Sequence, residues 1–169
     1  AGSSFAELRF IGTGTWSMND TNATATGAVI IESGAVTLPS GTLAVAGDFS
    51  NQGGSFSHNT SELRMSTTSS ATLRAGGSDL YGVTFADGVF TMADTSLSLL
   101  DDLSITNATA TLATGTLSIA GSFNAGGGSF DSATGTILFN SSDTGEIIDP
   151  GVSSFYNVNF GSGSGGWTI

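Results

Sequence analysis

Hydrophobic residues recur along the chain as short alternating pairs, separated by clusters of Gly, Asn, Asp and Ser. Val83/Phe85 and Leu103/Ile105 are typical, with one polar residue between the two apolar ones. An apolar residue at every second position marks a strand with one buried face, and the intervening clusters favour turns. No segment has the three-and-four spacing of an amphipathic helix. The sequence therefore predicts an all-β protein.

The chain also repeats itself, with a long period of about 75 residues. The segment 29–65 aligns without gaps on the segment 103–139, with 14 identities in 37 positions. A second motif occurs three times, and its Phe5, Leu80 and Phe155 are equally spaced along the chain. A fixed period of this kind is the signature of a repeat architecture.

We therefore expect a single solenoid domain over residues 1–169, with repeat units of approximately 1–75 and 76–150 and a partial unit at 151–169.

A shorter period lies within the long one. Met92, Leu112, Phe130, Ile148 and Trp167 follow one another at steps of roughly 18 to 20 residues, close to a quarter of the long repeat. Such a unit is too short to hold a strand, a helix and a second strand, but it accommodates two or three short strands with tight bends. The pattern predicts a parallel β-helix of about nine coils, whose termini lie at the same angle around its axis. A β-sandwich of antiparallel hairpins is the alternative.

Aromatic and glycine positions refine this prediction. Phe49, Phe56, Phe123 and Phe130 are expected to be stacked inside the tube. Six glycines in the repeated segments are expected at bends with positive φ. They are Gly47, Gly53, Gly54, Gly121, Gly127 and Gly128.

Composition limits the classes of partner and the location. The net charge is −11, Lys is absent and Arg occurs three times, which argues against nucleic acid as a partner. The sequence contains no run of 18 apolar residues, so it predicts no membrane-spanning helix. The start, Ala1-Gly2-Ser3-Ser4, would suit a mature secreted protein, so we expect an extracellular or cell-surface location. Five Asn-x-Ser/Thr sequons are candidate glycosylation sites: Asn19, Asn22, Asn59, Asn107 and Asn140.

The repeated pattern GTLxVAGxFxNxGGSFxxxTxxLxF, followed by SFYNVxF, resembles the strand-rich repeats of large bacterial and archaeal cell-surface proteins. The resemblance covers the whole chain. It implies an extended β-helical segment of an adhesin or fibre, secreted and without catalytic activity. It identifies no ligand-binding or catalytic residue.

Catalytic and metal-binding arrangements are weak in the sequence, and we expect no enzymatic activity. A polysaccharide-acting β-helix enzyme is the less favoured alternative, because such enzymes use paired carboxylates or basic residues in a groove. Asp101-Asp102 is the only adjacent acidic pair and is predicted to form a turn, while the sole histidine, His58, is predicted to lie exposed in a loop.

No cofactor is expected, although acidic residues in predicted turns leave Ca²⁺ open. These are Asp48, Asp131, Asp143 and Asp149.

These observations favour a structural role. We expect copies of the chain to stack end to end into a fibre or sheath through strand edges, because a solenoid without polar caps exposes unpaired strands and apolar core. Glycans or cell-surface components are further candidate partners, and a stalk segment of a large adhesin is the alternative. The candidate edge residues are Phe5, Leu8, Phe10, Phe155, Val158, Phe160, Trp167 and Ile169.

Overall fold

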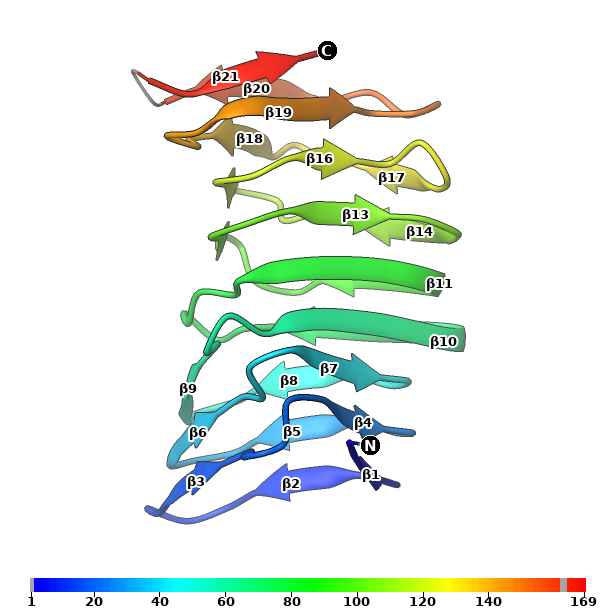
Figure 1. Ribbon diagram of the computed structural model, residues 1–169. Helices are drawn as coiled ribbons and strands as arrows, with labels where there is room; N and C mark the ends of the chain where they lie inside the picture. The colour runs from blue at the N-terminus through cyan, green and yellow to red at the C-terminus, as the bar shows by residue number, and fades with distance from the viewer. Residues whose placement is uncertain (1, 162–163) are drawn as a thin grey trace.

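The computed structural model describes residues 2–161 and 164–169, which form 21 strands wound into a tube of about eight coils (Figure 1). Every pairing between these strands is parallel. The predicted parallel β-helix is confirmed, and the sandwich alternative is wrong. Leu63 pairs with Val83, and Leu103 with Phe123, so one coil takes about 20 residues here. The expected nine shorter coils are therefore corrected to about eight longer ones.

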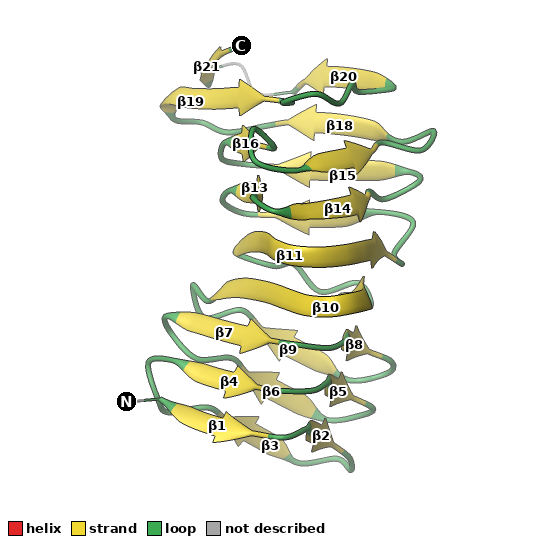
Figure 2. Cartoon of the chain, turned by 90° about the vertical axis from the view of Figure 1, so that its right-hand side faces the viewer, coloured by secondary structure: helices red, strands yellow, loops and turns green. Residues whose placement is uncertain are grey.

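The tube has three faces, each a stack of strands from successive coils (Figures 1 and 2). The first face holds β1 (Ser3–Phe5), β4 (Ala23–Ala25), β7 (Thr42–Val45), β13 (Leu103–Ile105), β16 (Phe123–Asn124), β19 (Thr144–Asp149) and β21 (Gly166–Thr168). The second holds β2 (Leu8–Phe10), β5 (Val29–Ile31), β8 (Phe49–Asn51), β14 (Ala108–Thr111) and β17 (Ser129–Asp131). The third holds β3 (Thr15–Ser17), β6 (Ala35–Thr37), β9 (Ser55–Ser57), β12 (Leu97–Leu99), β15 (Thr116–Ile119), β18 (Thr136–Phe139) and β20 (Asn157–Phe160).

Two long strands, β10 (Glu62–Arg74) and β11 (Gly82–Met92), run through the corner between the first and second faces (Figure 2). β10 pairs with β7 on the first face and with β8 on the second. On the third face Leu80 continues the stack, pairing with Leu99 of β12.

The sequence repeat is not a whole number of coils, which explains the wrong coil length. Leu8, Val83 and Val158 are equivalent residues of the repeat, yet they lie on the second, first and third faces in turn. One repeat therefore covers three coils and two faces of a fourth. The apolar series used to predict the coil slips by two positions at Phe130, which pairs with Ala110 and not with Leu112, and it changes face before Ile148. Both changes shortened its apparent period.

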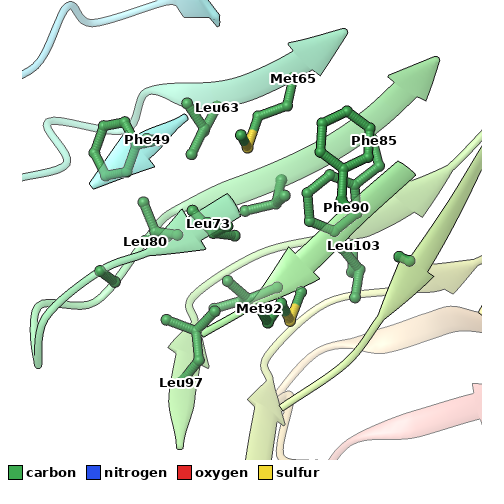
Figure 3. Close-up of a cluster of buried hydrophobic side chains, with 14 of the residues drawn as sticks. Phe49, Leu63, Met65, Leu73, Leu80, Phe85, Phe90, Met92, Leu97 and Leu103 are labelled. Atoms are coloured by element: carbon green, nitrogen blue, oxygen red, sulfur yellow. The ribbon is translucent and has the colours of Figure 1, made fainter. Parts of the chain in front are cut away.

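The core fills the tube along its whole length, because alternate residues of every face point inward. Figure 3 shows its part in the middle coils, between Phe49 and Leu103. Phe49 and Phe123 are fully buried, and Phe56 and Phe130 are less than one-tenth exposed, which confirms the four as core positions. Burying a large apolar side chain contributes about 1.5 to 3 kcal/mol. Apolar contacts within each coil and between neighbouring coils therefore contribute strongly to stability.

The predicted positive φ of the six repeated glycines is wrong. Among the described residues, the left-handed region is occupied by other glycines, including Gly34 and Gly88, and by three non-glycine residues. The repeated glycines lie instead where two coils approach closely: a Cβ on Gly127 would lie 2.2 Å from the Thr106 carbonyl oxygen, and one on Gly54 would lie 2.6 Å from a methyl of Ile31. They are needed for space between coils and not for an unusual backbone angle.

Candidate functional site: the two ends and the acidic corner

The N-terminal end of the tube is open and apolar. The outer edges of β1, β2 and β3 have no strand partner among the described residues. Phe5 is 38% exposed, and the Phe10 and Trp16 rings meet at 5.7 Å. They belong to a cavity of about 300 Å³ whose apolar lining is Phe5, Leu8, Phe10, Trp16, Met18 and Ala23. This end therefore offers a hydrophobic recess bordered by free backbone groups.

The C-terminal end exposes apolar side chains in the same way. All four residues of β20 are exposed, with Phe160 at 51%, and Ile169 is 86% exposed. The Phe160 ring stacks on Phe139 at 5.7 Å and contacts Trp167 at 5.3 Å. The indole nitrogen of Trp167 is buried without an acceptor among the described residues. The outer edges of β20 and β21 are likewise unpaired there.

The eight predicted edge residues thus separate into two groups at opposite ends of the tube. Phe5, Leu8 and Phe10 belong to the first coil. The other five lie in the last coil, where Phe155 packs on Phe123 and Phe130 at 5.1 Å. β1 and β21 both lie on the first face, so the two ends share one angular position, as expected.

A second candidate site lies at the corner between the third and first faces. Asp101 and Asp102 form the predicted turn, between β12 and β13. With Glu62, Thr84 and Tyr81 they line a cavity of about 340 Å³. Thr84 donates to Glu62 at 2.6 Å, and the backbone N–H of Ser122 donates to Asp102 at 2.7 Å. These carboxylates are engaged in structural hydrogen bonds.

Electrostatics at this corner follow from like charges held together. Partial burial raises the pKa of the Asp101 carboxyl, the Asp102 charge raises it further, and a hydrogen bond with the Tyr81 hydroxyl opposes both. The Asp101 charge in turn raises the pKa of Tyr81.

The His58 ring stacks on Tyr81 with centroids 5.8 Å apart, so His58 is half-buried in its loop and not exposed as predicted. The sequence pattern gave no sign of this contact, because it joins residues of adjacent coils.

The four acidic residues considered for Ca²⁺ lie in loops or at strand ends. The carboxylates of Asp131 and Asp149 accept the backbone N–H two residues ahead, from Ala133 at 2.8 Å and Gly151 at 2.9 Å. Asp48 accepts from the Thr72 N–H across a coil at 2.7 Å. Among the described residues, no three His, Asp or Glu side chains are grouped to hold a metal ion.

All five predicted glycosylation asparagines are exposed. Three use their amide groups in structural hydrogen bonds: Asn22 accepts from the Thr42 N–H, Asn59 donates to the Leu38 carbonyl and Asn107 donates to Asp87.

Comparisons with protein-family models, curated proteins and solved structures found no match. Within residues 2–161 and 164–169, no helix is long and apolar enough to traverse a bilayer.

Proposed function

We propose that this protein is an extracellular structural element that assembles end to end into a fibre or sheath and has no catalytic role. The observation that carries the proposal is the pair of apolar ends: each combines strands whose outer edges are unpaired among the described residues with exposed aromatic side chains. Strand edges of this kind are templates for pairing with another chain. A head-to-tail contact between two different surfaces extends without closing, which produces a filament.

The walls of the tube support the same role. The seven strands of the third face contain no charged residue and expose mainly Ser and Thr hydroxyls and Asn amides. The chain has no Lys and only three Arg, which leaves few sites for trypsin-like proteases. A net charge of −11 keeps the sides of neighbouring copies apart, so association is directed to the ends.

The test is assembly of purified protein, followed by light scattering and electron microscopy. Phe160→Lys places a charge in the C-terminal apolar surface and should abolish filaments, while the middle coils stay folded. Ser118→Lys is the matched control, because it places the same charge on the wall in β15.

Monomeric wild-type protein at high concentration would overturn the proposal and favour the stalk of a larger adhesin, in which further coils of one polypeptide cover these ends. Turnover of neutral or acidic polysaccharides would favour an enzyme.

A further inference from the structure

The three terminal segments at one end of the tube are the repeat equivalents of those at the other. Phe5 corresponds to Phe155, the Leu8/Phe10 pair to Val158/Phe160, and Trp16 to Trp167. Because the repeat is not a whole number of coils, equivalent segments lie on different faces. β2 is on the second face and β20 on the third; β3 is on the third and β21 on the first.

From this offset we infer that each subunit in the filament is turned by a third of a revolution relative to its neighbour. Each terminal segment then stacks on its own repeat equivalent in the next subunit. This inference rests on the proposed end-to-end assembly. A strand placed after β21 in the solenoid path falls on the second face, above residues 153–155. This segment lies on the second face because Ser153 accepts the Phe130 N–H of β17 at 2.8 Å. An untwisted neighbour would instead place its β1 on β21 and leave two strand positions empty.

The interior of the protein shows what kind of strand this segment accepts as a neighbour. The repeat equivalent of β2 is the first half of β11, where Val83 rests on Leu63 and Phe85 on Met65 of β10. In the joint, Leu8 and Phe10 rest on Val158 and Phe160. β20 reads Asn-Val-Asn-Phe where β10 reads Glu-Leu-Arg-Met, so both present an aliphatic and a larger apolar residue two positions apart.

The aromatic side chains fit the same arrangement. The N-terminal cavity of about 300 Å³ is lined by Phe10 and Trp16, and the side chains brought against it are Phe160 and Trp167. Phe160 already stacks on Phe139 at 5.7 Å in β18, the neighbouring strand of the third face. In the joint the aromatic column on β18 and β20 continues into Phe10 of the next subunit, and the edge N–H and C=O groups of β20 and β21 gain partners.

Engineered disulfides distinguish the two geometries, because the chain has no cysteine of its own. In the turned joint Thr168 of one subunit lies beside Ser17 of the next. In an untwisted joint, which continues the register of the first face, Ile169 lies beside Ser3. Neighbouring strands are about 4.8 Å apart, within the range a disulfide spans. Filaments of Ser17→Cys with Thr168→Cys should give a ladder of covalent oligomers on oxidation, and Ser3→Cys with Ile169→Cys should not. The single variants Thr168→Cys and Ile169→Cys control for accidental dimers.

Helical reconstruction of wild-type filaments gives an independent readout. The turned joint predicts a rotation of one third of a revolution and a rise of about 40 Å per subunit, from eight and one-third coils at about 4.8 Å each. Filaments that cross-link through Ser3→Cys with Ile169→Cys, or that show no rotation, overturn this joint but leave end-to-end assembly standing. Absence of wild-type filaments overturns both.

Discussion

The Phe49 and Phe56 rings meet edge to face at 5.4 Å, and their repeat equivalents Phe123 and Phe130 meet in the same way at 5.0 Å. The first pair joins the second and third faces, whereas the second pair joins the first and second. One aromatic contact thus closes two different corners of the tube. The geometry of this aromatic contact depends on the local path of the chain and not on the faces that the two rings come from.

Truncation of one of these rings should strongly destabilise the fold. Phe130→Ala removes a buried ring that contacts both Phe123 and Phe155, and it leaves a cavity between two coils. We expect a loss of about 3 to 5 kcal/mol in the free energy of unfolding, measured by urea titration. Val152→Ala, at a residue 91% exposed, is the control. A loss below about 1 kcal/mol for Phe130→Ala would show that the ring is not part of the packed core.

The buried amide of Asn51 links adjacent coils. This residue is only 1% exposed, and its side chain donates to the Ala75 carbonyl at 3.0 Å and accepts from the Gly54 N–H at 3.1 Å. We expect Asn51→Ala to cost about 1 to 3 kcal/mol in thermal or urea unfolding, because both partners lose a buried hydrogen bond. At the equivalent position Ala125 supplies its own carbonyl to the Gly128 N–H at 3.1 Å. An unchanged stability would mean that residue 51 of the variant can use its own carbonyl to bond the Gly54 N–H, as Ala125 does with Gly128.

Two glycines with positive φ separate backbone strain from crowding. A Cβ on Gly88 would lie 2.6 Å from the Thr67 carbonyl oxygen, whereas nothing lies within 4 Å of one on Gly77. Both Ala variants carry the backbone penalty of about 1 to 3 kcal/mol. We therefore expect Gly88→Ala to lower the melting temperature further than Gly77→Ala. Equal losses would show that the corner of β11 can widen to admit a methyl group.

The acidic corner should make stability depend on pH. The pKa of Asp101 is raised in the folded state, so its contribution is fully present below the unfolded pKa of about 3.9 and is lost as pH rises through the folded value. Asp101→Asn should therefore stabilise the protein at neutral pH, by less than about 1 kcal/mol because the site is largely solvated, and have no effect near pH 3. Asp79→Asn, at an exposed carboxylate, controls for net charge. A stabilisation that persists at pH 3 would contradict this origin.

The alternation of apolar and polar residues was sufficient to predict the strands and their inward-facing residues, because a pair such as Val83/Phe85 marks the buried side of a strand. The coil length was not accessible in this way. Phe130 and Ile148 belong to one apolar series but to different faces, and only the pairing partners reveal the change. The His58 and Tyr81 contact was missed for the same reason, since it depends on how much of the chain completes a turn.

The mismatch between repeat and coil also constrains how such a protein can change length in evolution. Duplication or loss of a single repeat unit would reorient every downstream coil, so that a surface formerly facing one direction would face another. Only gains or losses in multiples of three units would preserve the outward direction of the downstream coils. A lineage of such proteins should therefore either vary its repeat number in threes or carry no orientation-dependent surface beyond the repeats.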